Sequence, residues 1–227
     1  MNINDTTTLR INRTVNIIMK ATNISKIMKR IIDIFGGIVG TILLIPLVLS
    51  VKIASLLKKD KGSIFFAQNR IGKDGKVFKM YKFRTMIVGA EEELQRLLEE
   101  NEDIKNEYEL NKKIKHDPRV TEIGKILRKT SLDEFPQFIN ILKGQMSLVG
   151  PRPYLASEKN DMGEFYDDII TMKPGLTGIW QVSGRSNMKF EERLKMDMDY
   201  YNKNSLFGDI KILFKTIAVV LDRKGAV

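Results

Sequence analysis

One uninterrupted apolar segment limits what this 227-residue chain can fold into. Residues 34–51 read IFGGIVGTILLIPLVLSV and carry no charge, which is the composition and length of a helix that enters a membrane. The segment starts too late for a signal peptide, and no small-residue cleavage site follows it. A buried core helix is the alternative, because every face is apolar. We predict a membrane-embedded helix over residues 29–60, preceded by an N-terminal arm over residues 1–28.

Pro46 interrupts the apolar segment near its middle. It lacks a backbone donor and its ring clashes with the carbonyl of Ile42, so the helix is expected to break or kink there. Cationic residues flank the segment equally, at Lys20, Lys26, Lys29 and Arg30 before it and at Lys52, Lys58, Lys59 and Lys61 after it. Because cations mark the cytoplasmic side of a span, equal flanks favour a re-entrant helix with both ends in the cytoplasm. A kinked helix that spans the membrane stays open.

Charge and residue counts narrow the function classes. A net charge of +10 indicates an anionic partner such as nucleic acid, acidic lipid or a phosphorylated substrate. The absence of cysteine excludes disulfides and thiolate metal sites. The single histidine, His116, excludes a multi-histidine metal site. No nucleic-acid reading module is present and the cations flank the apolar segment, so we predict no nucleic-acid partner.

Residues 61–227 predict a small α+β domain that is mainly helical. Residues 63–86 indicate a β-hairpin, since two apolar runs flank the turn sequence Gly72-Lys-Asp-Gly75. Helices are predicted over residues 89–111, 122–129, 131–143, 190–201 and 206–221. The last has an apolar face at Leu206, Ile210, Leu213, Phe214 and Ile217, which can pack on the core or lie on a bilayer.

An acidic pair, Asp133-Glu134, is the strongest candidate for chemistry. Ser131-Leu-Asp-Glu134 also matches a helix capping box, and this structural explanation alone accounts for both acids. An ionised aspartate can instead attack phosphorus, while the neighbouring glutamate moves a proton or binds a metal. Mg²⁺ is the metal that one or two carboxylates with substrate phosphates prefer. Arg119, Lys125, Arg128 and Lys129 lie just upstream and suit phosphate oxygens.

Two runs carry a resemblance to a known family. DPRVTEIGKILRKTSLDEFPQFINILKGQMSLVGPRP and KPGLTGIWQVSGRS, with the apolar segment and MYKFRTM, closely resemble the bacterial sugar transferases that begin surface polysaccharide assembly. These are monotopic polyprenyl-phosphate phosphoglycosyl transferases, and the likeness runs from about Lys29 to the C-terminus in the short form of the family. It implies transfer of sugar 1-phosphate from a UDP-sugar to undecaprenyl phosphate, with release of UMP, at the cytoplasmic face of the inner membrane.

The resemblance also implies roles for individual residues. Asp133 matches the nucleophile that forms a covalent phosphosugar intermediate, and Glu134 matches its partner in proton handling or Mg²⁺ coordination. Pro46 matches the proline at which the membrane helix breaks. The predicted binding set for the donor or lipid phosphates is Lys82, Arg84, Arg119, Arg128, Arg152, Arg185 and Asp209. The chain departs from the family pattern at Ile45, Gln145 and Asn187, which puts the geometry of the helix break and some donor contacts in doubt.

Three competing functions follow. The first is two-step transfer through Asp133; the second is direct attack by the lipid phosphate with Asp133 as a metal ligand only; the third is a non-catalytic membrane scaffold. A homodimer is allowed. Asp197-Met-Asp199 has the D-x-D form of a metal clamp, but its residues point about 200° apart on a helix, so we interpret it as a solvated face with one functional acid. The sequence does not identify the sugar.

Overall fold

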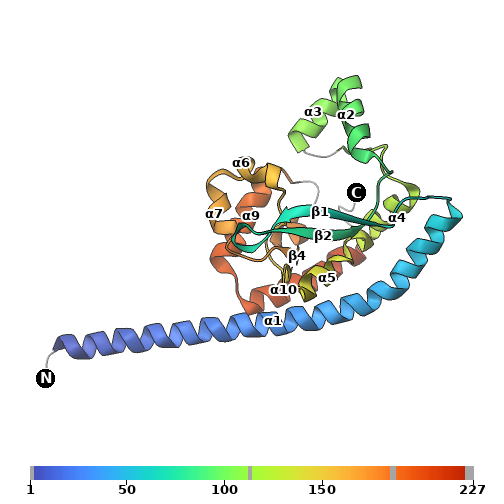
Figure 1. Cartoon of the computed structure of the whole chain (residues 1–227). Coiled ribbons are helices and arrows are strands. Elements are labelled where there is room, and N and C mark those ends of the chain that lie inside the picture. The colour runs from blue at the N-terminus through green and yellow to red at the C-terminus, as the bar shows by residue number, and fades with distance from the viewer. Residues whose placement is uncertain (1–2, 112–113, 185–187, 223–227) are drawn as a thin grey trace.

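A computed structural model describes residues 3–111, 114–184 and 188–222. Its longest element is helix α1 (Ile3–Leu57), which extends past a globular domain and then curves beneath it (Figure 1). The helix continues through Pro46, so the predicted break into two helices is wrong and a curve takes its place. The packing explains the continuity, because Leu44 and Val51 on either side of the proline are both buried against the domain. Whether the segment re-enters the membrane stays a prediction.

Three glycines let α1 approach the globular domain closely. A Cβ at Gly36 would press on Leu148, one at Gly37 on Leu142, and one at Gly40 would overlap the ring of Phe138. The opposite face of α1 is apolar and exposed, with Phe35 69% and Ile45 68% accessible. Within the described residues, the segment from Asn23 to Leu57 is long and apolar enough to cross a membrane.

The predicted hairpin is confirmed. Strand β1 (Phe65–Ile71) pairs antiparallel with β2 (Val77–Phe83), and Phe66 lies opposite Lys82. A 3₁₀ turn, η1 (Lys73–Gly75), connects them with Asp74 and Gly75 at positive φ. This is the left-handed conformation that Asp-Gly sequences adopt in tight hairpins.

The middle of the chain differs from the sequence prediction in two places. The predicted helix over 89–111 is a helical hairpin of α2 (Ala90–Glu100) and α3 (Glu102–Asn111), because Asn101 is extended and its side chain accepts from the backbone N–H of Ile104. Helix α4 (Glu122–Thr130) forms as predicted. The helix expected over 131–143 is instead a 3₁₀ turn, η2 (Leu132–Glu134), followed by α5 (Gln137–Leu142).

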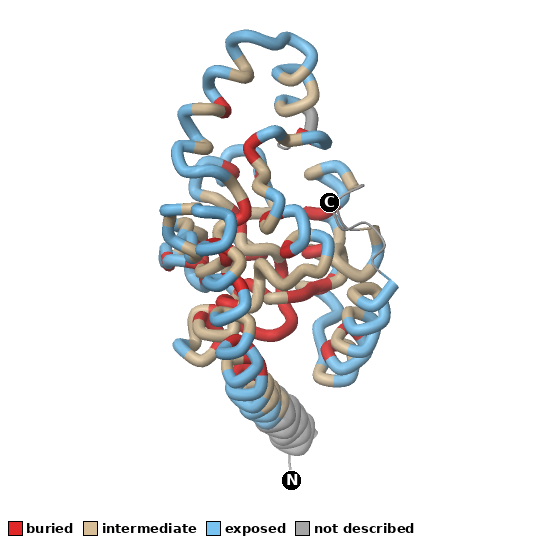
Figure 2. Tube along the Cα trace, turned by 90° about the vertical axis from the view of Figure 1, so that its right-hand side faces the viewer, coloured by how far each residue is buried: buried red, intermediate tan, exposed pale blue. Residues whose placement is uncertain are grey.

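The C-terminal half adds a second small sheet and a group of helices. Strand β3 (Ser147–Val149) pairs parallel with β4 (Gly175–Thr177). Both helices predicted near the end of the chain are present, as α9 (Phe190–Lys203) and α10 (Leu206–Leu221). The remaining short elements are η3 (Ala156–Glu158), α6 (Lys159–Met162), η4 (Gly163–Phe165), α7 (Tyr166–Ile169) and α8 (Ile179–Ser183). Figure 2 shows the buried residues gathered at the centre, between α1 and the α2–α3 hairpin.

Candidate active site

The acidic pair lies on the 3₁₀ turn η2, and the capping-box interpretation is wrong. Ser131 adopts the left-handed conformation at the end of α4 and its side chain makes no cap hydrogen bond. Leu132 and Phe135, on either side of the pair, pack into a cluster that includes Leu44 of α1. This packing fixes the turn near helix α1, and both carboxylates of the turn face Lys82 of the hairpin.

Lys82 of strand β2 holds the two carboxylates together. Its Nζ donates to Glu134 Oε1 at 2.7 Å and lies 3.8 Å from Asp133 Oδ2. The Glu134 side chain is 36% exposed, whereas that of Asp133 is 14% exposed. Asp133 is therefore the less hydrated acid of the pair, and Glu134 is the one that faces solvent.

Burial controls the ionisation of Asp133. Desolvation raises the pKa of the Asp133 carboxyl to about 6, opposed by the charge of Lys82 and assisted by that of Glu134. A carboxylate held in a poorly hydrated site is less stabilised by water, so it is a stronger nucleophile once ionised. The pair thus combines one acid of low exposure and raised pKa with one acid that is more exposed to solvent.

Arg128 completes this group from helix α4. Its Nε donates to the hydroxyl of Thr85 at 3.0 Å, and burial lowers the pKa of the guanidinium. The charge of Asp133 acts in the opposite direction on that pKa, which places Arg128 within electrostatic range of the acid. Arg128 and Lys82 therefore provide two cations near Asp133, and their role in phosphate binding stays a prediction.

Arg70, on strand β1, was missed by the sequence prediction. It shares the inner face of the hairpin with Lys82, since side chains alternate along a strand. Its guanidinium donates to Gln68 and to the carbonyl of Pro153, while its Nε has no hydrogen-bond partner among the described residues. Burial lowers the pKa of Arg70 to about 10, and the charges of Arg152 and Glu134 both act on it. A charged residue on the inward face of an amphipathic strand was the signal available in the sequence.

Arg152 lies within electrostatic range of Arg70. Its Nη2 is 3.5 Å from Glu158, and its guanidinium is 5.7 Å from the centre of the Trp180 ring. Asp197 accepts hydrogen bonds from the Arg152 backbone and the Tyr154 hydroxyl and is fully buried, whereas Asp199 is exposed and pairs with Lys203. The two acids of the D-x-D are thus separated, which agrees with the interpretation against a metal clamp, but Asp197 is not a solvated group.

The other predicted binding residues are engaged elsewhere. Arg84 contacts Asp60 and the carbonyls of Ser63 and Met86. Arg119 is buried, with two hydrogen bonds from its side chain to Asp117 and one to the carbonyl of Ala90. Asp209 pairs with Lys29 of α1 at 2.5 Å and accepts from Tyr200. Arg185 lies outside the described residues. Arg84, Arg119 and Asp209 make no hydrogen bond or ion pair with Asp133 in the described part of the chain, and the role of all four residues in substrate binding stays a prediction.

Among the described residues there is no group of three or more metal-ligating side chains. The donor set that fits Mg²⁺ is the adjacent pair Asp133 and Glu134, because this ion is commonly held by one or two carboxylates and by substrate phosphates. In this structure the ammonium of Lys82 lies 3.8 Å from an oxygen of Asp133 and 2.7 Å from an oxygen of Glu134, so a cationic side chain occupies the position between the two carboxylates.

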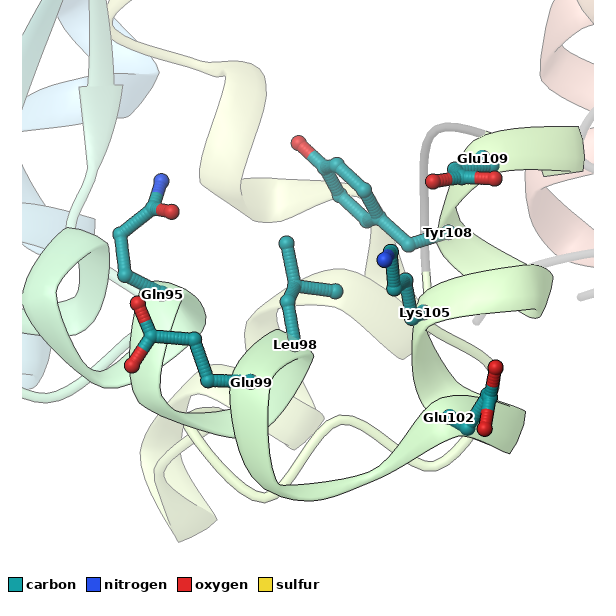
Figure 3. Close-up of a pocket in the computed structure, with 7 residues that line it drawn as sticks. All are labelled: Gln95, Leu98, Glu99, Glu102, Lys105, Tyr108 and Glu109. Atoms are coloured by element: carbon teal, nitrogen blue, oxygen red, sulfur yellow. The ribbon is translucent and has the colours of Figure 1, made fainter.

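A cavity lies elsewhere, between α2 and α3 (Figure 3). It measures about 500 Å³ and contains none of the predicted site residues. Its lining residues are Gln95, Leu98, Glu99, Glu102, Lys105, Tyr108 and Glu109. Three carboxylates against one lysine disfavour a phosphorylated ligand, so we place the candidate active site at Asp133 rather than in this cavity.

A carboxylic acid of low exposure beside two cations is an arrangement suited to phosphate chemistry. The family model described as bacterial sugar transferase matches residues 24–223. The chain therefore belongs to the bacterial sugar transferase family.

Three relatives show how far the similarity extends. The galactosyl transferase CpsE of Streptococcus agalactiae is 45% identical over 88% of this chain and 43% of its own length. The undecaprenyl-phosphate galactose phosphotransferase of Salmonella typhimurium is 42% identical over 89% of this chain and 42% of its own. The exopolysaccharide production protein ExoY of Rhizobium meliloti is 42% identical over 87% of both chains. The chain thus spans about two fifths of the first two relatives and most of the third.

Proposed function

We propose that this protein is a phosphoglycosyl transferase that moves sugar 1-phosphate from a UDP-sugar to undecaprenyl phosphate. The observation that carries the proposal is Asp133, whose side chain is 14% exposed and lies 3.8 Å from the ammonium of Lys82, on a turn that packs in one apolar cluster with Leu44 of α1. The Salmonella relative is named as an undecaprenyl-phosphate galactose phosphotransferase, and another relative is named as a UDP-glucose:undecaprenyl-phosphate glucose-1-phosphate transferase. The product would serve the first membrane step of a surface polysaccharide.

The proposed reaction has two displacements at one phosphorus atom. A carboxylate oxygen of Asp133 first attacks the sugar-side phosphorus; a bond from that phosphorus to the bridging oxygen breaks, and UMP leaves with the oxygen. An oxygen of undecaprenyl phosphate then attacks the same phosphorus, and the bond to Asp133 breaks. Sugar diphosphoundecaprenol is released and the free carboxylate returns, so no oxidant, reductant or further reactant is needed.

The cations of the site suit the charge that develops in this reaction. Lys82 and Arg128 lie near Asp133, where the transferred phosphoryl group would carry negative charge. Arg70 and Arg152 are two further cations in electrostatic range of each other, and we propose that they bind the remaining phosphate of the donor. Glu134 faces solvent and can accept or return a proton.

Mg²⁺ is the proposed cofactor. Asp133 and Glu134 would hold it, and the ion would supply charge neutralisation at phosphate oxygens. Binding of the ion would also free the ammonium of Lys82 from Glu134, since both cations compete for the same carboxylates.

The packing of α1 supports a re-entrant helix at the cytoplasmic face of the cell membrane. The globular domain contacts α1 from Lys29 to Val51, which is about 33 Å of helix and close to the thickness of the hydrocarbon layer. A helix perpendicular to the bilayer would carry the polar surface of the domain into hydrocarbon. A shallow, re-entrant path leaves Asp133 at the interface, where a soluble donor and a lipid acceptor meet.

Isotope exchange provides the test. With labelled UMP, unlabelled UDP-sugar and no lipid acceptor, a covalent intermediate predicts label in the UDP-sugar. Asp133→Asn should abolish exchange, and Asp103→Asn, an exposed acid on α3, is the matched control that should retain it. Screening several UDP-sugars identifies the donor.

Direct transfer in a ternary complex is the second candidate. It predicts UMP release only when undecaprenyl phosphate is present, and no isotope exchange without it. A scaffold without catalytic activity predicts no UMP release from any UDP-sugar under either condition.

A further inference from the structure

Arg128 differs from Arg84 and Arg119 in what holds its side chain. Arg84 and Arg119 each form an ion pair at 2.6 Å with an aspartate. Arg128 forms no ion pair among the described residues, and its hydrogen bond there joins Nε to the neutral hydroxyl of Thr85 at 3.0 Å. The positive charge of Arg128 is therefore not neutralised by a carboxylate in contact with it.

The bond to Thr85 determines which edge of the Arg128 guanidinium stays available. A guanidinium carries its N–H donors in a planar fork, and two parallel donors of that fork match two oxygens of a phosphate. Thr85 accepts from Nε, and the two Nη groups carry no hydrogen bond within the described part of the chain. A phosphate can therefore bind the Nη edge while Thr85 holds the Nε group in place.

Thr85 is itself fixed by close contact with the start of helix α4. Its residue is 9% exposed, and its carbonyl accepts from the backbone N–H of Thr121 at 3.0 Å and from the Thr121 hydroxyl at 3.3 Å. A Cβ at Gly124 would overlap the same carbonyl. Residues 121, 124 and 128 lie on one face of the helix, so the carbonyl of Thr85 contacts the start of α4 and its hydroxyl contacts Arg128 two turns further along.

The same contact relates two cations from different elements to one acid. Lys82 lies three residues before Thr85 in the chain, and its ammonium is 3.8 Å from Asp133. Arg128 approaches the same acid from α4, since the charge of Asp133 acts on its guanidinium. A hydroxyl suits this position, because a carboxylate in place of Thr85 would neutralise Arg128 and compete with a phosphate for it.

We propose that Thr85 is a positioning residue, which orients the guanidinium of Arg128 so that its Nη edge faces the phosphoryl group transferred at Asp133. Its role rests on the proposed function, because that function supplies the phosphoryl group. Thr85 acts through Arg128 and need not touch the substrate. Donors that are oriented before the reaction need no rearrangement as charge develops on phosphate oxygens.

Substitutions of Thr85 test this in the exchange of labelled UMP into UDP-sugar. Thr85→Val keeps the branched shape and removes the hydroxyl, so kcat of exchange should fall by about tenfold or more. Thr85→Ser keeps the hydroxyl and should stay within about threefold of the unmodified protein. Thr216→Val is the matched control, because it removes a hydroxyl bond of 2.7 Å to Thr177, away from the acidic pair. It should also retain the activity.

A second substitution separates positioning from a general loss of structure. In an Arg128→Lys background, Thr85→Val should change the exchange rate by less than about twofold, because an ammonium has no planar fork to orient. An equal loss in both backgrounds would overturn the proposal, and so would full activity of Thr85→Val. Thr85→Ala repeats the comparison, so one poorly folded variant does not decide the result.

Solvent exchange of the Arg128 Nε–H gives a readout that needs no turnover. It is followed by NMR of the full-length, nitrogen-15 arginine-labelled protein in detergent, with Arg128→Lys to assign the signal. Thr85→Val should accelerate this exchange severalfold and Thr216→Val should not. Unchanged exchange in Thr85→Val would overturn the proposal. Absence of UMP exchange and UMP release with every UDP-sugar would instead contradict the proposed function, and the Nε–H measurement would still decide whether Thr85 orients Arg128.

Discussion

At the residue scale, desolvation of the Asp133 carboxyl group determines its pKa. Leu132 and Phe135 hold its turn against the core, and the resulting desolvation raises the pKa of the carboxyl to about 6. The same environment weakens solvation of the ionised form, which favours attack on phosphorus. An acid on a solvated helix cap, as the capping-box pattern predicted, would have neither property.

The raised pKa predicts how activity depends on pH. In the proposed mechanism only the ionised form of Asp133 attacks, so UMP exchange should fall as the pH drops through about 6, by about tenfold for each further pH unit. Lys82 opposes the upward shift, so Lys82→Met should move the midpoint to higher pH as well as slow the reaction. The measurement is the pH profile of exchange for both proteins. A midpoint near 4, the ordinary value of aspartate, would contradict the role of burial.

Burial of Asp133 also predicts a cost in stability. The folded pKa of about 6 exceeds the ordinary 3.8, so stability is retained below pH 4 and is lost as the pH rises toward 6 and the folded carboxyl must ionise. At pH 7 this amounts to at most about 3 kcal/mol, at 1.36 kcal/mol per pKa unit. Asp133→Asn should therefore raise the melting temperature of the detergent-solubilised protein at pH 7, and raise it less at pH 4. Asp103→Asn should leave it unchanged, because Asp103 is exposed. A lower melting temperature for Asp133→Asn at pH 7 would count against a buried, ionised acid.

At the element scale, helix α1 joins the domain through glycines and a few polar side chains. Asp33 is buried and accepts from the hydroxyl of Ser147 and the backbone N–H of Leu148. Arg30 donates to the carbonyls of Ile141 and Leu142 at the end of α5. These contacts orient α1 on the domain, while its apolar side chains remain available to lipid.

The close contact between Gly40 of α1 and Phe138 of α5 predicts that one added methyl group at Gly40 lowers the stability of the docked helix. A Cβ at Gly40 would overlap the Phe138 ring, so Gly40→Ala should destabilise the docked helix by about 1–3 kcal/mol. Ile45→Ala is the control on the same helix, because its side chain is 68% exposed. Thermal unfolding and protease cleavage between α1 and β1 measure the difference. Equal stability of the two variants would show that α1 does not pack closely on α5.

Sequence patterns predicted the elements that depend on local chemistry. The hairpin, α4, α9 and α10 follow from turn residues and apolar periodicity. The sequence pattern did not predict the 3₁₀ turn at Asp133. This turn depends on the left-handed conformation of Ser131, which the packing of Leu132 and Phe135 imposes. Arg70 was missed because its neighbours Arg152 and Glu134 lie far from β1 in the sequence and come near it only in the folded chain. Lys82 entered the candidate site only through the family resemblance, whereas Arg128 was also indicated by its position just upstream of the pair; both lie near Asp133, and their role in substrate binding stays a prediction.

At the scale of the whole molecule, charge and apolar surface divide the protein along one direction. Helix α1 lies at one end, with α10 next to it, and the acidic α2–α3 hairpin lies at the other (Figures 1 and 2). Asp133 lies near α1, since its neighbours Leu132 and Phe135 share a cluster with Leu44. A lipid phosphate at headgroup depth would thus need little movement to reach the acid.

This arrangement predicts that both ends of the apolar segment are on the same side of the membrane. The domain packs against α1 before and after Pro46, through Asp33 and through Val51, so neither half can cross the bilayer without drawing polar surface with it. Lys26→Cys and Lys61→Cys place single exposed thiols at the two ends of a chain that has no cysteine. In intact spheroplasts an impermeant maleimide should label neither thiol, and after the membrane is opened it should label both. Labelling of one thiol alone in intact spheroplasts would establish a spanning helix, and the domain would then have to separate from one half of α1.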